Sequence, residues 1–202
     1  MAVRYNIEHM FSYIKGAATA MGWQDTLAAL YFARKCHKDQ QRKNEEPYIV
    51  HPLTMACHAI TLGLRNDAII AVCLLHDVVE DCGVNCNDIP CSDKVCNAVR
   101  LLSKKGGGID GLSTDEYYQQ ISASFTAAMV KLIDRCNNVS TMAEVFTPAK
   151  LEEYIAETRT FVLPLIRTIK ESYPEYSNQL FLLKYQIVSV VDAIEASMQA
   201  FH

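Results

Sequence analysis

Apolar residues recur along this chain at the spacing of amphipathic helices, and no segment shows a clear β-strand alternation. A first helix, with Ile7, Met10 and Phe11 on one face, should end before Gly22. Residues 26–40 repeat the same spacing and then give way to the polar segment QQRKNEE. The pattern predicts an all-α fold, a helical bundle whose apolar faces meet in one core.

Prolines and capping residues predict several helix boundaries. Two prolines flank the segment YIVH, and because proline favours an extended entry and then the first helical turn, a helix should start near Pro52, with His51 at its start. The next helix should be capped by Asn66 or Asp67 and run to about Cys82, where a glycine follows.

The rest of the chain is predicted to hold further helices separated by polar loops. The segment SKKGGG ends in three consecutive glycines, which favours a mobile surface loop. Pro164 should kink a long helix, and a final helix should cover Ser177 to Ala200. The remaining predicted N-terminal caps are Ser92, Ser113 with Glu116 as a capping box, and Thr147 before Pro148.

Length and charge narrow the class of protein. No Pro- or Ser-rich linker divides the 202 residues, so we predict a single domain over residues 1–202. The 19 basic and 23 acidic residues give a net charge of −4, and without a long basic run neither a nucleic-acid nor a membrane partner is expected. The N-terminus lacks a signal-peptide core, and the longest apolar run, Ala68 to Leu75, is far short of the ~20 residues that span a bilayer. We predict a cytoplasmic protein with a small-molecule partner; its oligomeric state stays open.

Eight cysteines fit this location as reduced thiols. Cys57 and Cys73 lie in apolar helical patterns, where a thiol packs as a small apolar side chain. Four others are close together but lack the paired CxxC spacing of common zinc modules, so a structural metal there is only a minor alternative: Cys82, Cys86, Cys91 and Cys96.

The segment AIIAVCLLHDVVED, residues 68–81, places polar side chains inside an apolar helix. His76 and Asp77 interrupt the apolar run, and Glu80 and Asp81 follow one turn later. Burying an ionised carboxylate costs free energy unless a partner or a metal ion compensates it. The segment therefore indicates a site of chemistry.

Two further residues have the chemistry to join the His76-Asp77 pair. His51 is fixed at a helix start by flanking prolines, and Asp134 lies on another apolar helix. Two imidazoles and two carboxylates suit Mn²⁺, Fe²⁺ or Zn²⁺ better than Mg²⁺ or Ca²⁺, which prefer oxygen ligands alone. We predict that one divalent ion is bound by His51, His76, Asp77 and Asp134.

Glu80 lies one helical turn from His76 and Asp77, so its carboxylate can orient an attacking water and accept its proton. Each candidate also has an ordinary structural interpretation. His51 fits a helix cap or a core hydrogen bonder, Glu80 and Asp81 fit a solvated turn, and Asp134 fits an ion pair with a basic neighbour. The metal site is preferred because it explains all of these polar residues on otherwise apolar faces.

The H…HD…D order of these residues resembles that of HD-domain metal-dependent phosphohydrolases. Three segments, HKDQQRKNEEPYIVHP, LLHDVVED and VKLIDRCNNVSTM, are similar to the hydrolase motifs of the RelA/SpoT family over about Tyr31 to Leu165. The resemblance implies an all-helical HD fold, a Mn²⁺ cofactor and removal of the 3′-pyrophosphate from ppGpp and pppGpp, with GDP or GTP as product. Because long relatives carry a synthetase domain after the HD domain and this chain stops at His202, it resembles the small stand-alone alarmone hydrolases such as metazoan SpoT homologues.

The resemblance also implies roles residue by residue. It makes Glu80 and Asp81 the catalytic pair beside the metal, and it places Arg42 and Lys43 against the guanine base and a nearby phosphate. Without the metal motif, Arg42 and Lys43 would be interpreted as a solvated basic loop. Contacts to the ribose and the base are implied for Asn138 and Thr141.

One departure from the family pattern concerns the 5′-phosphates. Tyr154 stands where many relatives have a basic residue. Lys104 and Lys105, beside Gly106 to Gly108, are candidates to replace that charge from a closing loop, and a plain surface loop is the alternative.

Two other functions stay open on the sequence. The metal half of the motif is shared across HD enzymes, so a phosphohydrolase acting on another nucleotide phosphate ester, such as NADPH, is the first alternative. A non-catalytic nucleotide sensor or interaction module is the second, although such a protein has no need for the Glu80-Asp81 pair.

Overall fold

The computed structural model describes residues 5–42, 45–105, 107 and 111–200. Across these residues the chain is helical, with no strand and one isolated antiparallel bridge between Gln41 and Pro47, so the predicted all-α fold is confirmed. The chain forms two compact units, Met1–Lys131 and Leu132–His202, which are described separately below. The single domain expected from the sequence stays a prediction. None of the described helices combines the length and the apolar character needed to cross a membrane.

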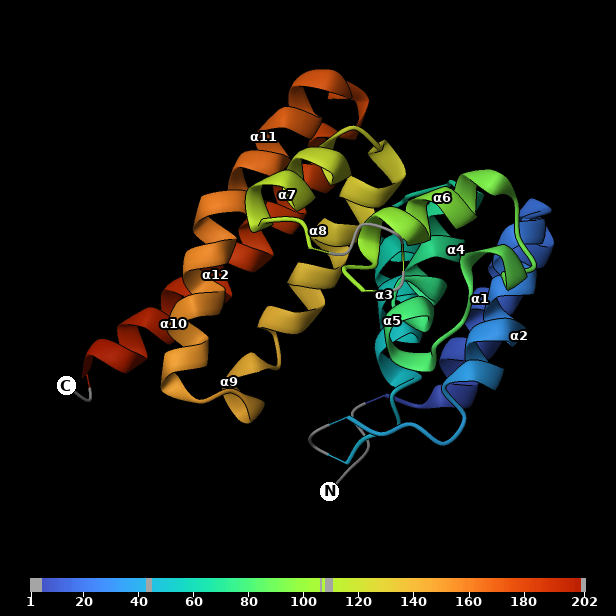
Figure 1. Cartoon of the computed structure of the whole chain (residues 1–202), viewed down its shortest axis with the longest axis horizontal. Coiled ribbons are helices and arrows are strands. Elements are labelled where there is room, and N and C mark those ends of the chain that lie inside the picture. Colours follow the sequence, from blue (N-terminus) through green and yellow to red (C-terminus); the bar gives the residue numbers. More distant parts are fainter. Residues whose placement is uncertain (1–4, 43–44, 106, 108–110, 201–202) are drawn as a thin grey trace. The chain divides into compact units, whose positions relative to one another are not determined.

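The first unit is built around helix α4. All eight side chains from Ala68 to Leu75 are buried, and the helix contacts α2, α3 and α6 (Figure 1). Burial of a large apolar side chain stabilises a fold by about 1.5–3 kcal/mol, so this helix anchors the residues that follow it. The helices of this unit are α1 (Ile7–Met21), α2 (Gln24–Cys36), α3 (Val50–Thr61), α4 (Asp67–Leu75), α5 (Val78–Cys82), η1 (Cys86–Asp88), α6 (Asp93–Leu102) and α7 (Thr114–Ser122).

The predicted continuous helix from Asn66 to Cys82 is wrong at one point. Helix α4 ends at Leu75 and α5 begins at Val78, so His76 and Asp77 lie in a turn between them. The physical reason is local: the His76 ring Nδ1 lies 3.1 Å from the carbonyl oxygen of Cys73, the acceptor that the Asp77 N–H would use in an unbroken helix. His76 keeps helical backbone angles, whereas Asp77, with φ −106° and ψ −2°, departs from them.

The two predicted cap candidates before α4 serve different helices. Asn66 caps α4 itself, because its Oδ1 accepts the Ile69 N–H at 3.2 Å. The Asp67 carboxylate instead accepts the backbone N–H groups of Asp25 at 3.1 Å and Thr26 at 2.8 Å, at the start of α2. Helix α2 has no side-chain cap of its own, so α4 supplies one and ties the two helices together.

Two of the other predicted helix caps are confirmed, and one differs. Ser113 forms the capping box with Glu116, and Thr147 caps the helix that begins at Pro148. Ser92 precedes α6 as predicted but makes no side-chain cap; its hydroxyl donates to Asp25 Oδ2 at 2.5 Å instead. Of the predicted SKKGGG loop, Gly106 and Gly108 lie outside the described residues.

The second unit consists mainly of two long helical runs. Helix α12 covers Ser177–Ala200, as predicted, and packs on α11 (Figure 1). A π-helical turn, η2, replaces regular α-helix just before Pro164, which is the irregularity expected where proline lacks its N–H. The elements are the end of α8 (Phe125–Val139), which spans the division between the units, α9 (Met142–Val145), α10 (Pro148–Glu157), η2 (Thr158–Val162), α11 (Leu163–Ser172), η3 (Pro174–Tyr176) and α12.

Candidate active site

Three of the predicted metal ligands converge in the first unit. His51 comes from the first turn of α3, and His76 and Asp77 come from the break between α4 and α5. His76 Nε2 lies 2.8 Å from Asp77 Oδ2 and 3.2 Å from His51 Nε2, and His51 Nε2 lies 3.8 Å from Asp77 Oδ2. Both imidazoles are buried, and Asp77 is half-buried.

The orientation of His76 suits a ligand role. When its Nδ1–H donates to the Cys73 carbonyl, the neutral ring keeps a lone pair on Nε2. That lone pair faces the Asp77 carboxylate and the His51 ring. A divalent cation placed among these two nitrogen atoms and the carboxylate would be attracted to all three.

The spacing of the three ligand atoms also fits a metal ion. Ligands about 2.1 Å from an ion in octahedral geometry are roughly 3.0 Å from their neighbours. The three ligand atoms here, 2.8, 3.2 and 3.8 Å apart, bracket that value. Across the described residues, His51, His76 and Asp77 form the group able to hold a metal ion, and no cysteine belongs to it.

Two residues that the sequence interpretation missed support this cluster from outside. The Tyr48 hydroxyl donates to Asp77 Oδ2 at 2.5 Å, and the Tyr48 ring stacks on His37 with 4.7 Å between ring centroids. Burial raises the pKa of the Tyr48 hydroxyl, and the negative charges of Asp77 and Asp81 raise it further. Tyr48 therefore stays protonated as a hydrogen-bond donor. In the sequence, the position of Tyr48 between the Arg42-Lys43 pair and His51 could have indicated that it belongs to the site.

The predicted catalytic carboxylates lie on α5, directly after the metal cluster. Glu80 Oε1 accepts the backbone N–H of Lys105 at 3.0 Å. Desolvation raises the pKa of Glu80, the Asp77 charge also raises it, and the Lys105 N–H lowers it. Asp81 is exposed and accepts a hydrogen bond from Gln40 at 3.3 Å. A carboxylate with a raised pKa is a stronger base, as proton abstraction from water requires.

The remaining predicted ligand belongs to the second unit. Asp134 lies on α8, where its Oδ1 accepts the Asn138 side-chain N–H at 2.7 Å. Its neighbour Arg135 pairs with Glu157 at 2.5 Å. Thr141 follows one turn later and donates to the Asn138 carbonyl at 3.4 Å. Asp134 and Asn138 thus lie in the last turns of α8, and Thr141 lies just beyond its end.

Arg42, one of the two residues predicted to bind the base and its phosphate, lies in the segment before α3. The Arg42 N–H donates to the Glu46 carbonyl at 2.8 Å beside the Gln41–Pro47 bridge. Glu45, at the turn, has a left-handed φ of 65°. Lys43, which the sequence pairs with Arg42, lies outside the described residues.

Tyr154, in place of the family's basic residue, is part of a packed cluster in the second unit. The Arg135 guanidinium lies 3.8 Å from the centre of its ring, and the Phe146 ring meets it edge-on at 5.4 Å. Arg135 is almost wholly buried and also donates to Thr158 Oγ1 at 3.0 Å. A cation is therefore present beside Tyr154, although it serves the packing of α8 against α10.

Comparison with known proteins identifies a family match that includes the three clustered residues. The family model for the HD domain matches residues 29–103, which include His51, His76 and Asp77. The chain therefore contains an HD domain. This HD-domain protein is 33% identical over 143 residues to a guanosine-3′,5′-bis(diphosphate) 3′-pyrophosphohydrolase of Aquifex aeolicus, an alignment that covers 68% of the chain and 20% of the relative. It is 28% identical over 178 residues to the bifunctional (p)ppGpp synthase/hydrolase SpoT of Escherichia coli K12, covering 81% and 25%.

A solved structure shares the fold. It is described as a metazoan ortholog of SpoT that hydrolyzes ppGpp and plays a role in starvation responses, and it matches with a TM-score of 0.62 and 19% identity. The match covers 81% of this chain and 95% of that one. The HD helical fold and the resemblance to the RelA/SpoT family are thereby confirmed. The chain spans only about a fifth to a quarter of the length of the curated relatives above.

Proposed function

We propose that this HD-domain protein hydrolyses the 3′-pyrophosphate of ppGpp and pppGpp, giving GDP or GTP and pyrophosphate. The observation that carries the proposal is the His51, His76 and Asp77 cluster inside an HD domain whose relatives are named pyrophosphohydrolases. Water supplies the oxygen that joins the departing phosphorus, the bond between that phosphorus and the ribose 3′-oxygen breaks, and the 3′-oxygen takes up a proton.

The metal proposal extends the cluster by one residue. On the chemistry of the sequence, we propose Asp134 as the fourth ligand, which would make a set of two imidazoles and two carboxylates with His51, His76 and Asp77. This mixed nitrogen and oxygen set favours a transition metal, and Mn²⁺ is our choice. When bound, the ion would lower the pKa of water toward ~7, and its positive charge would neutralise the phosphate oxygens.

The protein's own groups then divide the work. Glu80 accepts the proton of the attacking water, and its raised pKa favours that transfer. Asp81 orients the water beside it. Arg42 stacks on the guanine, and Lys43 neutralises a phosphate. Contacts to the ribose and the base come from Asn138 and Thr141.

A direct experiment measures pyrophosphate released from ppGpp by the purified full chain with and without Mn²⁺. We expect release only with metal, and its loss in His76→Ala. His9→Ala is the matched control, because His9 is exposed on α1 and its ring makes no hydrogen bond among the described residues. Failure to release pyrophosphate from ppGpp by a protein shown to hold one equivalent of Mn²⁺ would refute the proposal.

The same assay separates the alternatives. Phosphate release from NADPH at a higher kcat/KM than pyrophosphate release from ppGpp favours the broader phosphohydrolase. Under our proposal, Arg42→Ala and Asn138→Ala weaken the preference for guanine over adenine nucleotides, whereas the broader enzyme changes little. A sensor binds ppGpp without turnover, and Glu80→Ala leaves its affinity unchanged. A cytoplasmic location and a role in the stringent response stay predictions from the sequence.

A further inference from the structure

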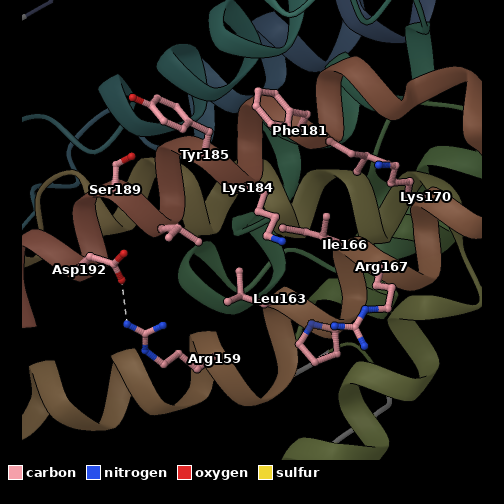
Figure 2. A pocket seen from close by; sticks show the side chains of 13 residues that line it. Arg159, Leu163, Ile166, Arg167, Lys170, Phe181, Lys184, Tyr185, Ser189 and Asp192 are labelled. Atoms are coloured by element: carbon pink, nitrogen blue, oxygen red, sulfur yellow. Dashed lines mark hydrogen bonds and ion pairs between the residues drawn. The ribbon is translucent and has the colours of Figure 1, made fainter.

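A groove in the second unit includes none of the candidate metal, catalytic or substrate-binding residues. It has a volume of about 830 Å³ and runs between α11 and α12, with Arg159 of η2 at one end (Figure 2). We call it the α11/α12 groove and define it by Leu163, Ile166, Arg167, Lys170, Lys184 and Tyr185, which line it together with Arg159.

The floor and one wall of the α11/α12 groove are apolar. Leu163 and Ile166 come from α11, and Figure 2 shows them pointing toward α12. On α12, Phe181 and Tyr185 are 64% and 63% exposed and lie one turn apart, with nearly parallel rings 6.4 Å between centroids. Exposed aromatic side chains beside an apolar channel are typical of a surface that binds a partner.

The rim of the groove carries uncompensated positive charge. Arg167, Lys170 and Lys184 are exposed and, within the described ranges, make no ion pair. Arg159 differs, because it bridges to Asp192 at 2.9 Å and to Glu195. Three free cations thus border an apolar channel on a protein whose net charge is −4. A ligand that matches the groove must be apolar along its centre and acidic at its edges.

We propose that the α11/α12 groove binds an acidic amphipathic helix of a partner protein. A helix is about 10–12 Å wide and presents apolar side chains at positions i, i+4 and i+7, which suit a channel between two helices. Leu163 and Ile166 would take those side chains, and Phe181 and Tyr185 would cover their flank. Glu or Asp on the borders of the helix would reach Arg167, Lys170 and Lys184. The proposal is independent of the proposed hydrolysis.

Charge and shape favour this occupant over three others. A second copy docked through the same face around a two-fold axis brings the two sets of cations together, which is repulsive. A bilayer surface is flat, whereas the groove is concave. A nucleotide needs groups that recognise its base. Besides its cations, the groove offers only the hydroxyls of Tyr185 and Ser189 and the carboxylate of Asp192, which already pairs with Arg159.

The test uses fluorescent helical peptides of about 18 residues, five turns, that share one leucine stripe and differ only in whether Glu, Gln or Lys flanks it. Anisotropy titrations with the full chain should show saturable binding of the Glu peptide, weaker binding of the Gln peptide and none of the Lys peptide. Lys184→Glu with Arg167→Glu should weaken binding about tenfold or more. Lys94→Glu is the charge-matched control, because Lys94 is exposed on α6 outside the groove.

A second variant protects the test from a folding defect. Phe181→Ala removes a ring that is exposed and not part of the core. It should therefore weaken binding of the Glu peptide and leave the circular dichroism spectrum unchanged. Equal binding of the Glu and Lys peptides, or unchanged binding in both the charge-reversed protein and Phe181→Ala, overturns the proposal. The proposal is also overturned if the Glu peptide does not bind and the charge-reversed protein loses another interaction of the wild type. That interaction would be binding to anionic vesicles, binding to GTP, or a dimer measured by light scattering.

Discussion

Tyr48→Phe is the sharpest perturbation that the site offers. The substitution removes one hydroxyl and keeps the ring, which stacks on His37 at 4.7 Å between centroids. The hydroxyl donates to Asp77 Oδ2 at 2.5 Å, and Asp77 is one of the clustered candidate ligands. The change therefore deletes the hydrogen bond to Asp77, together with a smaller interaction of the hydroxyl with Asp81, and leaves all ligands in place.

The magnitude follows from the type of bond. A hydrogen bond to a charged acceptor contributes about 1.5–3 kcal/mol, and about 1.4 kcal/mol corresponds to a tenfold change in an equilibrium constant. If the bond holds Asp77 in its binding orientation, its loss lowers Mn²⁺ affinity by about 10- to 100-fold. Outer groups that orient metal ligands in other proteins have effects of the same size.

Isothermal titration calorimetry with Mn²⁺ measures this affinity directly. Tyr31→Phe is the control, because Tyr31 is 52% exposed and its hydroxyl makes no hydrogen bond among the described residues. Tyr31→Phe should bind as the wild type does, and His76→Ala should not bind. Wild-type or tighter Mn²⁺ binding by Tyr48→Phe would refute the reasoning, because the hydroxyl would then compete with the ion for the carboxylate.

Further variants test the carboxylates and the backbone. Glu80→Gln should keep Mn²⁺ and lose about 10²- to 10⁴-fold in kcat; since a base with a raised pKa is ionised only above that pKa, wild-type kcat should fall as the pH drops through it, and Glu80→Gln should lack this acidic limb. Asp134→Asn should lower the Mn²⁺ affinity, and an unchanged titration would contradict its role as a ligand. An added Cβ at Gly107 would lie 2.7 Å from the Arg100 carbonyl oxygen, so Gly107→Ala should reduce the free energy of unfolding in urea by about 1–3 kcal/mol. Gly16→Ala, in α1 with nothing within 4 Å, should raise it by up to about 1 kcal/mol, and equal effects of the two substitutions would contradict this contrast.

The helices themselves were largely readable from the chain. Periodicity and end signals predicted α1 up to Gly22, the Ser113 capping box and the final helix from Ser177 to Ala200. These features depend on residues within about one turn of each other, so the sequence contains all the partners involved. The predicted side-chain cap by Ser92 was wrong, because its hydroxyl donates a hydrogen bond to Asp25, which is distant along the chain.

The break between α4 and α5 marks the limit of periodicity. The apolar run continues past His76, so spacing alone predicts one helix to Cys82. A ring-to-carbonyl hydrogen bond at Cys73 interrupts it, and apolar periodicity does not register that competition. The same break sets the directions of His76 and Asp77, so the site geometry was the part that the pattern could not give.

The sequence by itself determined the helical class, the end signals and the chemical types of the site residues, because these follow from side-chain identity and near neighbours. Only the tertiary structure decided that His51 meets His76, that Tyr48 holds Asp77 across 29 positions, and that Asp67 caps a helix 41 positions away. Each of these contacts joins groups that lie far apart along the chain. Their distances are set by how the buried face of α4 packs, and that packing is a property of the whole core, not of any short segment.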